Sequence, residues 1–335
     1  MQLILSVTFP FFALVLLGFG AAWRGWLPDV AVPGLNAYVL YFALPCMLFR
    51  FGASLPVAQL IDPALMAVYA TCSVLVVALT VAATCRRRVG GDGVDLKNAA
   101  FGGLVAAFPN SGFMGVPLLV ALFGAHAAGP VIATLLIDLF LTSTLCLALS
   151  QAQALHAQAT AGPQNWAMAR TALRSLRSAS TNPQPWAIGL GALCAAFSVQ
   201  PPGPITQVVQ MLAASASPVA LFTIGAVLWR AGRHAPQRTP VRHYLPVALI
   251  KLLVHPLLVG AVGWMALKAS WPVPRFGLTM ITLTAALPSA SNVSLLAQRY
   301  GADNGRIARI ILCSTVLAFA SFSAAVWQTQ QWSGG

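Results

Sequence analysis

The segment 106–119, AAFPNSGFMGVPLL, places helix-breaking and hydrogen-bonding residues inside a long apolar run. Pro109 and Pro117 each remove a backbone donor and clash with a preceding carbonyl group, while Asn110 and Ser111 add polar side chains at the same place. Backbone that leaves the helix at membrane depth is tolerated only against protein or a water-filled cavity. The segment therefore predicts a break in a helix with a cavity beside it.

A second segment of the same kind lies near the end of the chain, where Pro288 is followed by SASN at 289–292. The Ser and Asn side chains can hydrogen-bond locally and so compete with helix formation. Two broken helices in equivalent positions of two halves would cross near the bilayer midplane, with their half-helix N-termini directing partial positive charge at the crossing. Such a site suits a carboxylate. The alternative is that Pro and Gly only kink these helices for packing.

Three ionisable residues lie well inside apolar runs, away from their ends, where a charge costs a few kcal/mol. Asp138 lies in LLIDLFLTST, and Lys251 lies in ALIKLLVHPLL with His255 one turn later on the same helix face. We predict that Lys251 lies near the substrate carboxylates or pairs with Asp138, and that Asp138 and His255 take part in ion coupling. The structural alternatives are that Lys251 reaches the interface and that His255 bonds a carbonyl freed by Pro256. The residues predicted to bind substrate are Pro109, Asn110, Ser111, Gly112, Pro117, Lys251, Pro288, Ser289, Ser291 and Asn292.

Membrane-spanning helices must position these residues. The chain of 335 residues is 58% hydrophobic and only 7% charged, so most of its surface must face lipid. We predict an all-α polytopic membrane protein, in which residues 151–184 form a polar linker between residues 1–150 and 185–335. Apolar runs near the roughly 20 residues that cross a bilayer lie at 3–23, 33–55, 62–84, 99–123, 129–150, 185–200, 205–229, 243–267, 276–298 and 306–327.

The distribution of Lys and Arg indicates the orientation of these helices. With the N-terminus outside, 15 of the 19 basic residues fall in the inner connections, and only Lys268 and Arg275 fall in outer loops. Because inner loops carry the excess of positive charge, we expect both termini outside. Arg50, near the outer end of the second run, is expected to reach the interface. The charges form no basic face, which argues against nucleic acid as a partner.

The two halves of the chain contain matching segments. PCMLFRFGA at 45–53 matches PVALFTIGA at 218–226, and AAFP at 106–109 matches AALP at 285–288. Each half holds five apolar runs, so the second copy starts on the opposite side of the membrane and is inverted. Inverted repeats are typical of secondary transporters, whose two related conformations face the two sides of the membrane.

At these residues the chain resembles the auxin efflux carrier family, which includes bacterial dicarboxylate carriers. The similar segments are FPNSGFMGVPLL (108–119), LNAYVLYFALPCMLF (35–49), SPVALFTIGAVL (217–228) and ALPSASNVSLLAQRYG (286–301). The resemblance implies ten transmembrane helices in a five-plus-five inverted repeat, with broken helices 4 and 9 crossing. It also implies a scaffold from helices 1, 2, 6 and 7 and a mobile transport domain from helices 3–5 and 8–10.

The resemblance implies secondary transport of small organic anions, such as auxin in plants and malate or malonate in bacteria, by an elevator-type alternating-access mechanism. The short linker at 151–184 is similar to that of bacterial members, and the chain looks most like the malonate carriers. A multi-pass protein of the bacterial inner membrane is therefore expected, with a carboxylate substrate, H⁺ or Na⁺ as a coupling ion, and a homodimer as one candidate assembly. No cofactor and no metal site are expected, because the six Cys are scattered without paired spacing.

Three other classes of protein compete with this interpretation. A membrane enzyme would need a metal or nucleophile constellation, and the sequence has no HExxH motif, no P-loop and no clustered His. A membrane receptor would more often carry a soluble signalling domain. A sodium-coupled carrier of the bile-acid type, with a similar crossover, is the main alternative, although the shortage of acidic residues weighs mildly against a Na⁺ site. The choice of carboxylate and the direction of transport stay open at this point.

Overall fold

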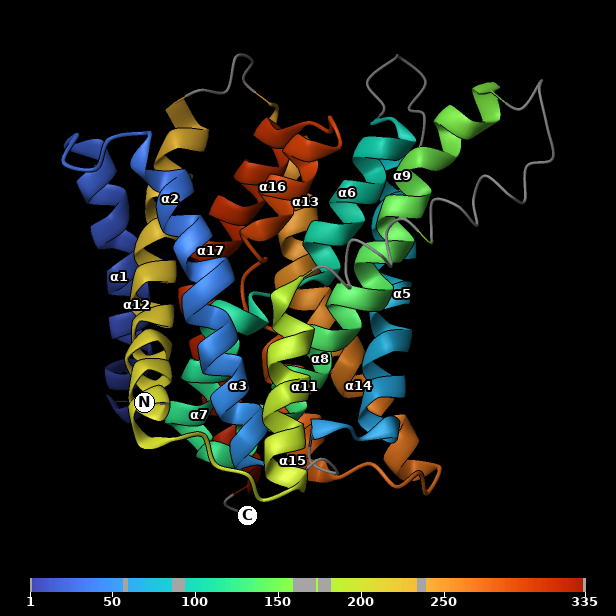
Figure 1. Ribbon diagram of the computed structural model, residues 1–335. Helices are drawn as coiled ribbons and strands as arrows, with labels where there is room; N and C mark the ends of the chain where they lie inside the picture. Colours follow the sequence, from blue (N-terminus) through green and yellow to red (C-terminus); the bar gives the residue numbers. More distant parts are fainter. Residues whose placement is uncertain are drawn as a thin grey trace.

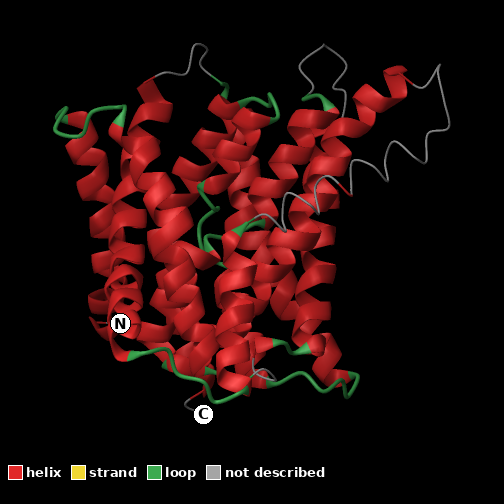
Figure 2. Ribbon diagram, in the orientation of Figure 1, coloured by secondary structure: helices red, strands yellow, loops and turns green. Residues whose placement is uncertain are grey.

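The computed structural model describes residues 2–56, 60–85, 94–158, 173, 182–233 and 239–333. In these residues the chain is helical apart from short connections and one isolated β-bridge, and Figure 2 shows the helices side by side in one bundle. Helices prevail because backbone N–H and C=O groups in hydrocarbon must bond to one another. The N and C labels both lie toward the lower end of the bundle in Figure 1.

The described chain divides into helices joined by short turns. The first half has α1 (Gln2–Trp23), α2 (Ala31–Tyr38), α3 (Leu44–Ser54), α5 (Pro63–Cys85), α6 (Leu96–Ala107), α7 (Val116–Phe123), α8 (Ala128–Ile137) and α9 (Ser143–Gln158). The second half has α11 (Pro183–Ala196), α12 (Gly203–Arg233), α13 (Val241–Leu249), α14 (His255–Lys268), α15 (Arg275–Ala285), α16 (Asn292–Arg299) and α17 (Asn304–Ser333). The π-helical turns are η1 (Val39–Ala43), η2 (Ser111–Gly115), η4 (Asp138–Thr142) and η6 (Ile250–Val254), and a 3-10 turn, η3 (Ala125–Ala127), precedes α8.

Seven helical stretches of the described chain are long and apolar enough to cross a bilayer. They correspond to seven of the ten predicted spans, and they make this a multi-pass membrane protein. Their bounds are Ser6–Trp23, Ala31–Ser54, Pro63–Cys85, Ala125–Gln151, Gly203–Arg230, Val241–Lys268 and Asn304–Thr329.

The other three predicted spans are shorter or interrupted. The predicted span 185–200 is α11, which has 14 residues and ends at Ala196; Ser198 then turns the chain with a left-handed φ of 53°. The predicted spans 99–123 and 276–298 are each divided, the first into α6 and α7 and the second into α15 and α16. These two divisions fall where the sequence places its helix-breaking residues.

Three of the four described π-helical turns come just before a proline. Pro45, Pro117 and Pro256 occupy the second position of α3, α7 and α14. A proline cannot donate to the carbonyl four residues back, and its ring clashes with that carbonyl. Widening the preceding turn moves the hydrogen bonds to partners five residues back. The π geometry therefore relieves a clash that proline creates.

The fourth described π-helical turn, η4, begins at Asp138. The Oγ of Ser143 donates to the carbonyl O of Asp138, five residues back, at 2.8 Å. This side-chain bond supplies a partner for a carbonyl displaced from regular helix geometry. Asp138 and Lys251 thus both lie in π-helical turns, η4 and η6, and such turns occur frequently at functional sites.

Two helix pairs bring their backbones into close contact through glycine. α1 packs along α12, and α3 packs along α11. A Cβ built on Gly18 of α1 or on Gly225 of α12 would overlap the backbone of the partner helix. The same holds for Gly52 of α3 and Gly191 of α11. Because lipid provides no hydrophobic force between helices, close packing through small residues holds such pairs together.

Replacing any of these four glycines with Ala is expected to lower the thermal unfolding temperature, because the added methyl group forces two backbones apart. We expect each substitution to cost about 1–3 kcal/mol, the usual cost of overpacking, measured by thermal unfolding of the detergent-solubilised variants. Gly20 of α1 and Gly189 of α11 have open space at the Cβ position. Gly20→Ala and Gly189→Ala are therefore matched controls, and losses as large in these controls would contradict the role given to close contact.

Arg306 of α17 ties together the end of the bundle that lies uppermost in Figure 1. Arg306 is 2% exposed, and its side chain donates to the carbonyl O of His243 in α13 and to that of Asn98 in α6, each at 2.8 Å. The Oδ1 of Asn98 accepts in turn from the N–H of Asp303 at 2.7 Å. These bonds fix the starts of α6 and α17, and so the direction from which α6 approaches the middle of the bundle.

Candidate functional site

Two non-helical segments meet inside the bundle, one between α6 and η2 and one between α15 and α16 (Figure 2). An antiparallel bridge joins Pro109 to Ser289. The N–H of Asn110 donates to the carbonyl O of Pro288 at 2.8 Å. Because each proline removes helical hydrogen bonds from its own segment, the two segments supply each other with partners.

A second backbone bond joins the two segments, from the N–H of Ala290 to the carbonyl O of Phe108 at 3.0 Å. We call the place where residues 108–110 meet residues 288–290 the crossing. The half-helix formed by η2 and α7 begins directly after the crossing, and so does α16. The first N–H groups of both carry the partial positive ends of helix dipoles. The prediction of two interrupted segments that meet is therefore confirmed, and their meeting point favours negative charge.

A small cavity of about 10 Å³ lies against the crossing. This is about the space that one water molecule needs, so the cavity is too small for a carboxylate in this conformation. Apolar walls come from Leu44, Phe113 and Leu135. The polar and backbone lining consists of Gln184 and five of the predicted binding residues: Pro109, Asn110, Ser111, Gly112 and Asn292.

Several polar groups at the crossing have no partner in the described chain. Ser289 Oγ and Asn292 Oδ1 are buried without a hydrogen bond. Asn110 and Gln184 are 5% and 2% exposed, and their hydrogen bonds to other described residues are made by backbone groups and not by their side chains. An unpaired buried polar group costs about 1–3 kcal/mol, and native structures keep few of them. Asn292 Oδ1 is an acceptor and Ser289 Oγ can donate or accept, so the cluster is suited to a small polar ligand that forms hydrogen bonds with side-chain amide and hydroxyl groups.

Gln184 is a residue that the sequence does not single out, because it falls at the end of the predicted polar linker 151–184, just before the sixth apolar run. In the structure it lies at the start of α11, where the side chain of Asn182 accepts from its N–H at 3.0 Å. Pro183 occupies the first position of the helix. The Asn-Pro pair is a helix start signal that marks this N-terminus. Its depth, level with the crossing, follows from packing between distant parts of the chain.

The remaining predicted binding residues lie outside the small cavity. Pro288 and Ser289 form part of the crossing itself, and Ser291 comes directly before α16. Pro117 lines a separate, larger cavity between α1, α3 and α12. The structure thus gathers the predicted binding residues at the crossing, with the exceptions of Pro117 and Lys251.

Lys251 lies at the broken end of α15. It is fully buried, and its Nζ donates to the carbonyl O of Ala285, the last residue of α15, at 2.7 Å. Its Nζ also lies 3.2 Å from Nδ1 of His255, whose Nε2 is buried without a partner. A cation at a helix C-terminus offsets the partial negative charge of the last carbonyl groups. Lys251 therefore caps the half-helix that ends at the crossing.

Asp138 completes this second polar cluster. It is fully buried and accepts from Tyr69 Oη at 3.0 Å and from Thr142 Oγ1 at 3.1 Å. No ion pair joins it to Lys251 in the described chain; the two are linked through the ring of Tyr69, whose centre lies 5.7 Å from that of His255, the residue next to Lys251 in this cluster. Of the two predicted arrangements for Lys251, the structure therefore shows neither a direct pair with Asp138 nor a place in the lining of the small cavity.

Residues 3–328 match the family described as Membrane transport protein. A protein of Rhizobium meliloti (strain 1021) named "Putative malonate transporter" is 28% identical over 327 residues, which cover 97% of this chain and 95% of that protein. An "Uncharacterized transporter" of Methanothermobacter thermautotrophicus is 24% identical over 310 residues, which cover 92% of each chain. These matches extend over both interrupted segments and over the polar cluster around Asp138 and Lys251.

Proposed function

This chain belongs to the membrane transport protein family, and from this premise we propose that it is a secondary transporter of small organic anions, with malonate among its substrates. The observation that carries the proposal is the crossing, where two half-helix N-termini and the unpaired amide groups of Asn110, Gln184 and Asn292 surround one cavity. Backbone N–H and amide NH₂ groups are donors that a carboxylate accepts. Malonate is included because of the name of the Rhizobium meliloti relative.

We also propose that the chain forms ten transmembrane helices in two inverted halves, 1–150 and 185–335. The linker 151–184 between them falls largely outside the described residues. Support comes from Gly52 of α3 and Gly225 of α12, which occupy matching positions in the two repeated segments. Each packs against the first helix of the other half, α11 for Gly52 and α1 for Gly225. A twofold relation between the halves would produce this reciprocal contact.

The same packing supports a division into two groups of helices. We propose that α1, α2, α3, α11 and α12 form a scaffold and that the other helices form a transport domain that carries the crossing. Within the proposed domain, α5 packs against α6, α14 against α15 and α13 against α17. Because the cavity at the crossing holds about one water, binding and release of a carboxylate require the two groups to move apart. We propose an elevator-type motion of the transport domain along the scaffold.

We propose that Asp138 and His255 couple transport to a cation, with H⁺ as the first candidate. Import of a dianion against an inside-negative potential costs about 2.3 kcal/mol per charge per 100 mV, so an importer needs cations that travel with the substrate. Lys251 connects this cluster to the crossing through its bond to Ala285. A change of charge in the cluster would therefore act on the end of the half-helix beside the substrate site.

The proposed orientation has both termini outside the inner membrane of a bacterial cell. Its support is the excess of Lys and Arg in the connections that the sequence assigns to the inner side. A reporter fused to the C-terminus should therefore be active only outside the cytoplasm, and activity in the cytoplasm would reverse the assignment.

The function is tested by flux of labelled malonate, malate and acetate into liposomes that contain the purified protein, with the membrane potential and the pH gradient set separately. We expect uptake of a carboxylate above that of empty liposomes, and an increase when protons flow inward. Replacing Na⁺ with choline should leave the flux unchanged, whereas a loss of flux would favour the sodium-coupled alternative. Absence of flux for every carboxylate under every gradient would contradict the proposal.

A further inference from the structure

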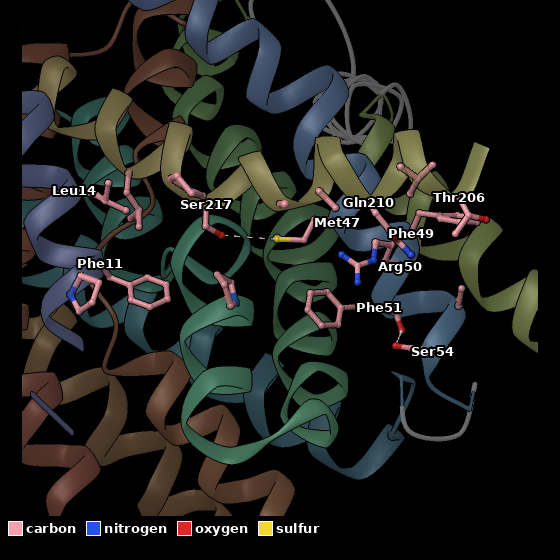
Figure 3. A pocket seen from close by; sticks show the side chains of 18 of the residues that line it. Phe11, Leu14, Met47, Phe49, Arg50, Phe51, Ser54, Thr206, Gln210 and Ser217 are labelled. Atoms are coloured by element: carbon pink, nitrogen blue, oxygen red, sulfur yellow. Dashed lines mark hydrogen bonds between the residues drawn. The ribbon is translucent and has the colours of Figure 1, made fainter. Parts of the chain in front are cut away.

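A second, larger cavity of about 590 Å³ lies between α1, α3 and α12 (Figure 3). Its lining includes Ser54 at the end of α3 and Pro201 in the connection before α12, so the cavity reaches the lower end of the bundle in Figure 1, where the chain termini lie. Most of the lining side chains are apolar, such as Phe11 and Phe51. We call this cavity the Arg50 vestibule, after the one cation among its lining residues.

The Arg50 vestibule and the cavity at the crossing share two walls. Leu44 lines the small cavity and Met47 lines the vestibule, and residues three apart lie on the same face of a helix. On the other wall, Phe113 lines the small cavity and Pro117 lines the vestibule, again about one turn apart. The two cavities therefore lie one behind the other along the interface between α3 and the half-helix formed by η2 and α7.

Met47 lies near the boundary between the two cavities. Ser217 Oγ of α12 donates to its Sδ at 3.9 Å (Figure 3). Methionine is unbranched and has three rotatable bonds, so it repacks more easily than other large apolar side chains. A path from the terminal end of the bundle to the crossing would therefore require Met47 to change its conformation.

Arg50 is a cation without a counter-ion in this vestibule. Its side chain is exposed, and no hydrogen bond or ion pair joins it to another residue of the described chain. Figure 3 shows its guanidinium near Phe51 and Met47. Low-dielectric walls concentrate the field of a charge within a cleft and raise the local concentration of ions of opposite sign. The planar guanidinium also matches a carboxylate with two parallel hydrogen bonds.

We propose that the Arg50 vestibule is a first binding site for the transported carboxylate on the side of the chain termini, and that Arg50 holds the anion before it reaches the crossing. The proposal rests on the proposed function, since it needs a carboxylate that travels through the protein. It assigns to Arg50 a role different from the contact with the interface that its sequence position suggests. Gln210 on α12 lines the same cavity, and its amide NH₂ group is a donor for the anion.

The test uses the full chain in liposomes, with malonate as the probe and with the orientation of the protein measured by protease access to a C-terminal tag. Arg50→Gln is expected to raise the half-saturating malonate concentration about tenfold when malonate is added on the side of the termini. From the opposite side, and in maximal flux, we expect less than a twofold change. Arg50→Lys should recover part of the loss, because it restores the charge without the planar fork.

Arg275→Gln is the matched control. Arg275 is an exposed arginine at the start of α15, at the same end of the bundle, and it lines neither cavity. Arg275→Gln should leave the half-saturating malonate concentration unchanged, whichever side malonate is added to. The vestibule proposal is overturned if Arg50→Gln keeps wild-type maximal flux and its half-saturating malonate concentration is unchanged or shifts equally from both sides. The proposed function would then remain intact. A wild-type protein that carries no carboxylate would overturn both.

Discussion

Replacing Lys251 with Met is expected to reduce carboxylate flux about a hundredfold, equivalent to ~2.7 kcal/mol in the transport barrier. The substitution keeps the length of the side chain but removes the donor that caps the carbonyl of Ala285. It also leaves Asp138 buried without its nearby positive charge, and an uncompensated buried charge is strongly destabilising. We therefore also expect a lower thermal unfolding temperature. Flux in liposomes and unfolding of the solubilised protein are the two measurements.

A double variant separates the role of this cluster in transport from its role in stability. In Asp138→Asn/Lys251→Met both buried charges are absent, so most of the lost stability should return. Flux should stay low, because the cap on α15 and the ionisable carboxylate are both missing. Lys268→Met is the control, since Lys268 lies at the exposed end of α14 with its Nζ 5.3 Å from the ring centre of Trp264. Normal flux in both Asp138→Asn and Lys251→Met would remove the cluster from the mechanism.

Replacing Asn110 or Asn292 with Ala is expected to raise the half-saturating malonate concentration about 10- to 100-fold and to leave the unfolding temperature nearly unchanged. The two results go together because no hydrogen bond joins the side chain of Asn110 or Asn292 to another residue of the described chain. Removing either side chain therefore costs a hydrogen bond to the substrate and no hydrogen bond within the protein. Gln184→Ala should behave in the same way, since its side chain lines the same cavity.

Asn98→Ala is the matched control for these variants. Asn98 lies on α6, the half-helix that leads to Asn110, but its Oδ1 accepts from the N–H of Asp303 at 2.7 Å. We expect the opposite pattern, with a lower unfolding temperature and an unchanged half-saturating concentration. An equal loss of affinity in Asn98→Ala and Asn110→Ala would show that the effect does not depend on the crossing.

The two breaks could be predicted from local backbone chemistry, and their meeting could be predicted from the repeat that relates the two halves. Pro109 and Pro288 cannot continue a helix in the usual way, and the Asn and Ser beside them offer the backbone other partners. The same reasoning places the two breaks in matching positions of the two halves. A distortion of the helix near Ile250–Val254 could also be predicted in part, because Pro256 follows this turn closely.

Contacts between distant residues could not be predicted in the same way. Lys251 and Ala285 are 34 residues apart, and no spacing rule assigns a lysine on one helix to the last carbonyl of another. Gln184 falls at the end of the segment predicted as a polar linker, and only the packing of α11 against α3 places it at the crossing. The length of α11 also differs from the prediction, because the turn at Ser198 ends the helix before the apolar composition does.

The most direct test of the crossing as an anion site is the thermal stabilisation of the purified protein by malonate. A ligand that binds only the folded state stabilises it by RT ln(1 + [L]/Kd). We predict stabilisation that grows with malonate concentration in the wild type and in Gly189→Ala, and that is absent in Asn110→Ala/Asn292→Ala. A wild-type protein that no mono- or dicarboxylate stabilises, or a double variant stabilised as strongly as the wild type, would contradict the account.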